Sequence, residues 1–204
     1  MRVTIYVEGG APGPKADARF REAWSEFFRK AGLEKRRPAV VRGKGRRDTH
    51  RDYCNHIANK DDGLPLLLVD SEDAVAPGKS VWQHLAERKD DSLKKPNGAG
   101  DDDAFLMIRC MEAWLLADRE GLKFKKFFGQ GFNKNAIPDW REPENVPRHD
   151  AVEALKNATR ACGPRAYAKG DLSFRLLSEI DPEPVEQQCP AAKRLLDRLR
   201  DVLS

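Results

Sequence analysis

Apolar and polar positions in the first part of the chain follow two periods in turn. Val3 to Val7 alternates Val, Ile and Val with Thr and Tyr, which is typical of a strand, and the pattern stops at Glu8 and two glycines. After a loop rich in Pro and Gly, apolar side chains recur at helical spacing over residues 16–31, and Gly32 is a natural cap. The chain therefore begins with a strand, a loop and an amphipathic helix.

The same alternation continues as far as residue 118. It predicts a strand over Ala39 to Arg42, a helix over 49–59, a strand over Leu66 to Val69, and a strand at 104–108 that runs into a helix. Residues 74–103 are irregular apart from a short helical stretch around Trp82, and 94–103 is the best candidate for a disordered loop. Strands that alternate with helices require crossover connections and favour a largely parallel sheet.

The C-terminal part of the chain is predicted to be mainly helical. Helical patterns occur at about 120–127, 150–161, 171–180 and 191–203, with Pro-rich connectors between them. We therefore expect an α/β fold: a mostly parallel central sheet over 1–118, flanked by helices and carrying an irregular insertion at about 74–103, with a helical part at 119–204 packed on it.

Composition excludes several classes of protein. The longest apolar runs are too short to cross a bilayer and the N-terminus has no signal-peptide pattern, so we expect a soluble cytoplasmic protein without a membrane role. The four cysteines are scattered without a CxxC pair, which argues against a zinc knuckle or a disulfide framework. The chain has no Walker A sequence and no nucleophile elbow.

Positive charge is concentrated in one stretch. Residues 35–51 hold eight Lys or Arg against one Asp, a net charge of +7 compared with +4 for the whole chain. The cations that follow the second predicted strand are candidates for holding a nucleic-acid backbone, without base readout: Arg42, Lys44, Arg46 and Arg47. The alternative interpretation is a solvated face of the protein.

Carboxylates follow three of the predicted strands. Glu8 ends the first strand, Asp70 and Glu72 follow the apolar strand at 66–69, and Glu112 comes soon after 104–108. Because ligands gather at the carboxyl ends of parallel strands, these acids are expected to converge and to bind Mg²⁺ or Mn²⁺. Each acid also has a simpler interpretation: a turn at Glu8, a helix N-cap cluster at Asp70, and a buried Glu112 that needs a partner.

The order of these motifs resembles a known fold. A strand ending in Glu-Gly, followed by a strand ending in an Asp-x-Asp-type pair, here Asp70-x-Glu72, is similar to the Toprim fold of topoisomerases, primases and overcoming-lysogenization-defect (OLD) type nucleases. From Val3 to about Leu199 the chain resembles a bacterial family of unknown function with a Toprim-like fold, whose members are often encoded beside an ABC or AAA ATPase. The motifs concerned are IYVEGG, VRGKGRRDTHRDYCNHI, LLLVDSED, FLMIRCMEAWLLAD and AYAKGDLSFRLLSEIDPEPVEQQCPAAKRL.

The resemblance implies roles for individual residues. Glu8 corresponds to the Toprim glutamate, a metal ligand or general acid/base, and Asp70 with Glu72 to the acidic pair, for which Asp73 could substitute. Glu112 resembles the glutamate that completes a second metal site. Lys169 resembles a lysine that stabilises charge on the transferred phosphate, although it could also be an exposed residue before a helix. The resemblance thus implies Glu8, Asp70 and Lys169 as catalytic residues and two ions.

The function that follows is a metal-dependent Toprim-type nuclease that hydrolyses phosphodiester bonds. The family resemblance further implies the effector of a bacterial anti-phage defence system controlled by a partner ATPase. One alternative is a noncatalytic subunit that binds nucleic acid or a partner protein, and another is Toprim chemistry on a small phosphate ester or nucleotide. Homo-oligomers are compatible with all three.

Overall fold

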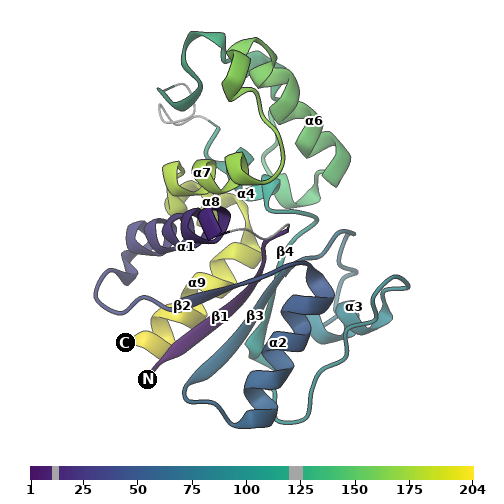
Figure 1. The fold of residues 1–204 in the computed structure, drawn as a ribbon. Coiled ribbons are helices and arrows are strands. Elements are labelled where there is room, and N and C mark those ends of the chain that lie inside the picture. Colours follow the sequence, from purple (N-terminus) through teal and green to yellow (C-terminus); the bar gives the residue numbers. More distant parts are fainter. Residues whose placement is uncertain (11–13, 120–125) are drawn as a thin grey trace.

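A parallel β-sheet with helices on both faces forms the centre of the molecule (Figure 1). The computed structural model describes residues 1–10, 14–119 and 126–204. Within them four strands form one sheet in the order β2-β1-β3-β4, and every pairing is parallel. The strands are β1 (Val3–Glu8), β2 (Ala39–Gly43), β3 (Leu64–Asp70) and β4 (Ala104–Met107). The predicted α/β fold with a parallel, Rossmann-like sheet is confirmed.

The helices lie in two layers around this sheet. Those described are α1 (Pro14–Phe28), α2 (Arg46–Asn59), α3 (Val81–Glu87), α4 (Glu112–Ala117), α6 (Arg148–Thr159), α7 (Asp171–Glu179), α8 (Pro182–Gln188) and α9 (Pro190–Leu203). Helices α2 and α3 cover one face, and α1 and α9 cover the other (Figure 1). The chain leaves β1 to form β2 on one side and then returns to form β3 on the other, so the topological switch point lies between β1 and β3.

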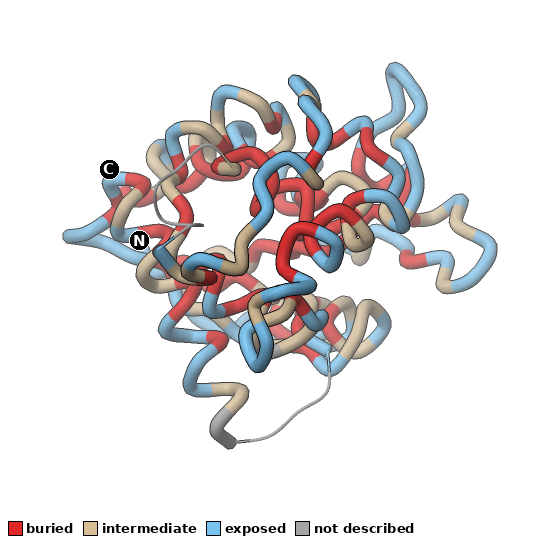
Figure 2. The backbone as a smooth tube through the Cα atoms, turned by 90° about the horizontal axis from the view of Figure 1, so that it is seen from above, coloured by how far each residue is buried: buried red, intermediate tan, exposed pale blue. Residues whose placement is uncertain are grey.

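Alternate residues of the strands supply two separate hydrophobic cores. Ile5 and Leu68 lie in the larger core with the α1 residue Trp24, whereas Leu67 lies in the smaller core with Tyr53 of α2. Figure 2 shows the buried segments gathered in the interior and the exposed ones around them. The strand β3 is apolar on both faces because both faces are covered by helices.

The predicted elements match the observed ones apart from shifts of a few residues at their ends, such as the start of α2 at Arg46, and apart from two larger differences and one gap. Residues 182–188 were expected to be a connector, but they form α8, because Pro182 stands at the start of the helix, where its missing N–H costs nothing. The prediction of disorder at 94–103 is wrong: Trp82 Nε1 donates a 3.0 Å hydrogen bond to the Gly100 carbonyl oxygen and fixes this loop. The helix predicted at about 120–127 falls mostly outside the described residues.

The C-terminal helices are packed onto the sheet and its N-terminal helix. Helix α7 contacts α1, α9 contacts β4, and α6 contacts α4. Side chains from both parts of the chain share the larger core, including Phe20 of α1 and Phe174 of α7, whose ring centroids are 4.9 Å apart. In the described residues no helix is both long and apolar enough to span a bilayer, and the four cysteines are free thiols.

Candidate metal centre

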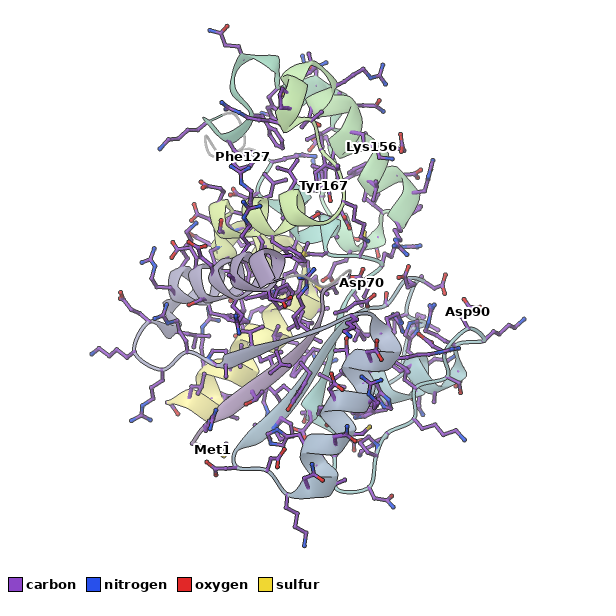
Figure 3. The ribbon with its side chains drawn as sticks, in the orientation of Figure 1. Met1, Asp70, Asp90, Phe127, Lys156 and Tyr167 are labelled. Atoms are coloured by element: carbon purple, nitrogen blue, oxygen red, sulfur yellow. The ribbon has the colours of Figure 1, made fainter. Side chains whose placement is uncertain are left out.

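Three carboxylates meet at the switch point of the sheet. Glu8 is the last residue of β1, Asp70 is the last residue of β3, and Glu72 follows two positions later. Each offers one oxygen atom, and these atoms all lie within 4.8 Å of one another. Figure 3 shows Asp70 at the upper end of the sheet, facing the helices of the C-terminal part. The predicted convergence of these acids is therefore present in the structure.

Backbone amides hold the two strand-end acids in place. The Met111 N–H donates to Asp70 Oδ1 at 3.1 Å, and the Asp70 N–H donates to Glu8 Oε2 at 3.3 Å. The Arg46 guanidinium donates to the carbonyl oxygen of Asp70 from the other side. The Asp70 residue is only 6% exposed, so its orientation is fixed by the fold and not by solvent.

Crowding and burial disfavour the charged forms of these acids. Burial raises the pKa of Asp70 to about 7, with a further contribution from the neighbouring Glu8 charge and an opposing one from Lys169. Burial also raises the pKa of Glu8, and Arg46 opposes that shift most strongly. A bound cation would relieve both effects, and three carboxylates are the hard oxygen donors that Mg²⁺ and Mn²⁺ prefer. The residues present therefore fit a divalent ion.

The backbone adopts an unusual conformation beside this group. Glu72 and Arg109 both have left-handed φ angles, of 64° and 62°. Two hydrogen bonds join the segments that follow β3 and β4. The Glu72 N–H donates to the Arg109 carbonyl oxygen at 3.1 Å, and the Arg109 N–H donates to Ser71 Oγ at 2.6 Å. Non-glycine residues in this region cost energy and are retained where the surrounding contacts determine them. This turn sets the direction of the Glu72 side chain.

Glu112 lies beside this group, and of its two buried carboxylate oxygens Oε1 has a hydrogen-bond donor whereas Oε2 has none among the described residues. Its carboxylate is fully buried and accepts a 2.6 Å hydrogen bond from the Tyr167 hydroxyl group. Lys169 Nζ lies 3.7 Å from Glu112 Oε2 and 3.7 Å from Asp70 Oδ2. Lys169 thus joins Glu112 to the three-acid group, which matches its predicted position at the site.

Asp73 is not part of the group. Its side chain is 77% exposed and pairs with Arg88, at 2.7 Å between Oδ2 and Nη1. The turn at Glu72 sends the two side chains in different directions. The expectation that Asp73 could substitute for Glu72 as a ligand is therefore corrected by the geometry.

Two of the four cations predicted to bind nucleic acid are instead buried in contacts within the protein. Arg42 donates to the Gly9 carbonyl oxygen at 2.9 Å and pairs with Asp17 at 2.8 Å, and Arg46 pairs with Asp91. The side chains of Arg42 and Arg46 are 8% and 9% exposed, so they are not available to bind a nucleic-acid backbone, contrary to the prediction. Charge composition gave no sign of this burial. The other two candidates, Lys44 and Arg47, are exposed at the same end of the sheet.

Arg148 is a site residue that the sequence did not indicate. It is the first residue of α6, and its guanidinium pairs with the Glu72 carboxylate. The two residues are far apart in the chain and Arg148 belongs to no motif, so no local pattern could have identified it. The site therefore includes two cations from the C-terminal part, Arg148 and Lys169.

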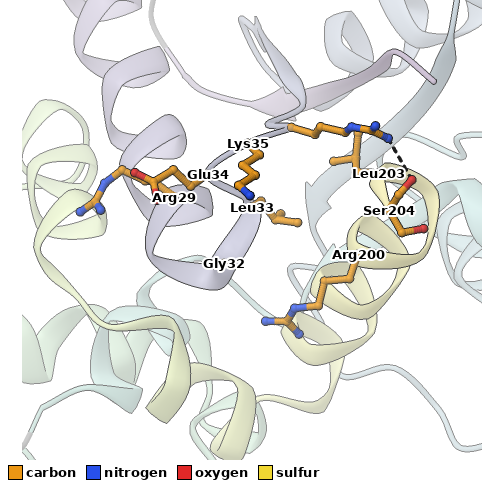
Figure 4. Close-up of a pocket in the computed structure, with 9 residues that line it drawn as sticks. Arg29, Gly32, Leu33, Glu34, Lys35, Arg200, Leu203 and Ser204 are labelled. Carbon is orange, nitrogen blue, oxygen red and sulfur yellow. Dashed lines mark hydrogen bonds between the residues drawn. The ribbon is translucent and has the colours of Figure 1, made fainter.

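A cavity elsewhere in the molecule is unrelated to these acids (Figure 4). Its volume is about 510 Å³, and it is lined by residues 29–36 and the end of α9. Three of its cations already have partners: Arg29 pairs with Glu26, Arg200 pairs with Glu186, and Arg36 donates to the Ser204 carbonyl oxygen. Both chain ends lie near the amino end of β1 (Figure 1), away from the acidic group.

The fold and the site together define a class: a Rossmann-like α/β protein with an acidic, candidate divalent-cation centre at its switch point. Within that class, the chain belongs to the family described as "Domain of unknown function (DUF4276)", whose sequence model matches residues 18–200. Neither the curated proteins nor the solved structures contain a match to this chain.

Proposed function

We propose that this protein is a metal-dependent phosphodiesterase of the Toprim type that cleaves nucleic acid. The observation that carries the proposal is the convergence of Glu8, Asp70 and Glu72, with one oxygen atom from each within 4.8 Å of the others. The position of this group supports it further, because ligands of open α/β sheets bind outside the carboxyl ends of the strands at the switch point.

The residues of the site divide into two tasks. Glu8, Asp70 and Glu72 would hold Mg²⁺ or Mn²⁺, which when bound supplies Lewis-acid polarisation of a phosphate and activation of water. Lys169 carries a positive charge beside Asp70 and Glu112, where it stabilises charge that develops on the phosphate during transfer. Arg46 opposes the effect of burial on the pKa of Glu8, which favours the ionised form that a metal ligand needs.

The second ion implied by the resemblance would require Glu112. That carboxylate is engaged by Tyr167 and Lys169, so Lys169 would have to move for Glu112 to become a ligand. We therefore propose the three-acid group as the primary ion site and Glu112 as a ligand of a secondary ion site.

The proposed substrate is a nucleic acid bound without base recognition. Lys44 and Arg47 are exposed at the carboxyl end of the sheet, where phosphate contacts would position a strand without reading its sequence. A role as the effector of an anti-phage system, with control by an ABC or AAA ATPase, is part of the same proposal and is supported only by the family resemblance.

A noncatalytic binding subunit is the second candidate. The observation in its favour is that protein cations already neutralise two of the acids, since Arg148 pairs with Glu72 and Lys169 lies near Asp70. These cations lower the need for a bound ion, as a noncatalytic site would require.

The test is Mn²⁺ binding by calorimetry, followed by nicking assays on supercoiled DNA and on tRNA. We expect Glu8→Gln and Asp70→Asn to lose most of the Mn²⁺ affinity, while the matched control Asp73→Asn, an acid outside the group, retains it. Metal binding with metal-dependent cleavage supports the nuclease. Metal binding without cleavage favours the regulatory subunit, and no binding at millimolar Mn²⁺ overturns the metal site.

A further inference from the structure

Arg148 stands where an incoming ion and an incoming substrate would meet. Its guanidinium pairs with Glu72 Oε2, and its charge also acts on Glu8 and Asp70. Its side chain is 40% exposed, whereas the Glu72 side chain is 19% exposed. Arg148 is therefore the more exposed partner of its ion pair with Glu72, at the edge of the acidic group.

Arg148 and a divalent ion compete for the same carboxylate. When the Glu72 carboxylate coordinates an ion, the ion's positive charge offsets the negative charge that attracts the Arg148 guanidinium. A divalent ion also attracts the carboxylate more strongly than a monovalent guanidinium does. An ion bound to Glu8, Asp70 and Glu72 would therefore release Arg148 from its partner while leaving it anchored at the start of α6.

A released arginine beside a metal centre suits one class of ligand. The guanidinium presents paired N–H donors that match two phosphate oxygens, which a lysine does not do. A phosphate that reached the ion at the three-acid group would lie beside this side chain. The exposed position of Arg148 leaves it free to turn from Glu72 to such a group.

We propose that Arg148 exchanges partners: it pairs with Glu72 in the metal-free protein and binds a phosphate group of the nucleic-acid substrate once a divalent ion occupies the acids. This inference rests on the proposed function. The exchange couples the binding of the ion to the binding of the nucleic acid. The ion frees Arg148 to bind the phosphate, and the phosphate keeps Arg148 away from Glu72, which is then available to the ion. Ion and nucleic acid then bind cooperatively, and the coupling is the same in both directions.

The first test measures Mn²⁺ affinity in the absence of nucleic acid. Arg148→Gln removes the competitor, so we expect it to bind Mn²⁺ about two- to fivefold more tightly than the wild-type protein, as befits the loss of a partly exposed ion pair. The matched control is Arg160→Gln, which removes the same charge from the exposed residue directly after the same helix and should leave Mn²⁺ affinity unchanged. Because Glu72 loses its role as ligand in Glu72→Gln, adding Arg148→Gln to that variant should give a smaller gain.

The second test measures the binding of a fluorescent oligonucleotide in the presence and absence of Ca²⁺. This ion binds to oxygen ligands and is used here so that the oligonucleotide is not cleaved during the measurement. We expect Arg148→Gln to weaken binding about tenfold with Ca²⁺ and little without it, and Arg148→Lys to restore part of the loss. Circular dichroism and thermal unfolding check that each variant is folded.

The outcomes separate this inference from the proposed function. If wild-type protein binds Mn²⁺ and Arg148→Gln binds it no more tightly, the exchange is overturned and the metal centre stands. An equal loss of oligonucleotide affinity with and without Ca²⁺ also overturns it, since Arg148 would then contact phosphate without first leaving Glu72. If wild-type protein binds no Mn²⁺, the proposed function fails and the inference fails with it.

Discussion

The Tyr167 hydroxyl group donates a 2.6 Å hydrogen bond to the Glu112 carboxylate, and both side chains are buried. The same hydroxyl oxygen lies 2.8 Å from Ser173 Oγ, so one phenol connects α4 to the start of α7. Burial and the Glu112 charge raise the pKa of Tyr167, so its hydroxyl group keeps its proton near neutral pH and can donate to Glu112.

Removing this hydroxyl should destabilise the fold. In Tyr167→Phe the buried Glu112 Oε1 loses its donor, and we expect the free energy of unfolding to fall by about 1–3 kcal/mol in urea titrations. The matched control is Tyr53→Phe, because the Tyr53 hydroxyl is buried without a hydrogen-bond partner among the described residues and its removal should be neutral or stabilising. Equal effects of the two substitutions would mean that the hydrogen bond to Glu112 contributes nothing.

Metal affinity should depend on pH. Asp70 has a pKa of about 7 in the ion-free protein, so below that pH a proton competes with the ion for the carboxylate. We expect Mn²⁺ affinity to fall by up to about tenfold per pH unit below pH 6 and to level off above pH 8, with proton release on binding near neutral pH. Calorimetry in buffers of different ionisation enthalpy measures both quantities. An affinity that is constant from pH 5.5 to pH 8 would mean that the pKa of Asp70 is not raised to this range.

A second buried acid should make stability itself depend on pH. Burial raises the pKa of Glu144 to about 7, although the Ala191 N–H donates to its Oε2 at 3.2 Å. Between about pH 4.5 and pH 7, Glu144 is therefore protonated in the folded protein and ionised in the unfolded chain. The contribution of this group to the free energy of unfolding falls as pH rises through that interval, by up to about 3 kcal/mol.

The substitution Glu144→Gln isolates this effect. We expect the variant to be more stable than the wild-type protein at pH 8, where ionised Glu144 is costly, and the gain to shrink at pH 5, where the wild-type group is largely protonated. Urea unfolding at the two pH values measures the difference. Glu142→Gln is the control, because this nearby glutamate is exposed and its replacement should give no gain at either pH.

The cations after β2 should separate into structural and binding residues. Arg42 packs against the rings of Phe20 and Phe174, at 5.5 and 5.3 Å from their centroids, in addition to its polar contacts, so Arg42→Gln should cost about 1–3 kcal/mol of stability. Lys44→Gln and Arg47→Gln should leave stability within about 0.5 kcal/mol. Each of these two should lower the salt dependence of nucleic-acid binding by about one unit of slope. Salt titrations that show no change for either variant would exclude this surface.

The sequence predicted the sheet well because its signals are local. The alternation in β1 and the two-sided apolar run in β3 follow directly from how each strand is covered, and parallel strands bring their carboxyl ends together wherever they lie in the chain. Glu8 and Asp70 could therefore be placed at one edge without coordinates. The missed helix α8 has a local cause, since prolines read as breaks unless they stand at a helix start.

The parts of the site that the sequence could not predict depend on contacts between distant residues. The pairing of Arg148 with Glu72 requires knowing how α6 packs above the sheet, and charge alone does not distinguish buried Arg42 from exposed Lys44. The turn that separates Glu72 from Asp73 depends on the strand-end bonds to Arg109, which are also nonlocal.

Two of the cations beside the acids come from the other part of the chain. Glu8, Asp70, Glu72 and Glu112 precede residue 118, whereas Arg148 and Lys169 follow it. Cutting the chain at that boundary would leave a fragment whose acids keep Arg46 but lose Arg148 and Lys169, with a bare apolar face where α7 and α9 had packed. The helical part thus supplies both packing and counter-charge to the sheet, so we expect neither part to fold normally when it is expressed alone.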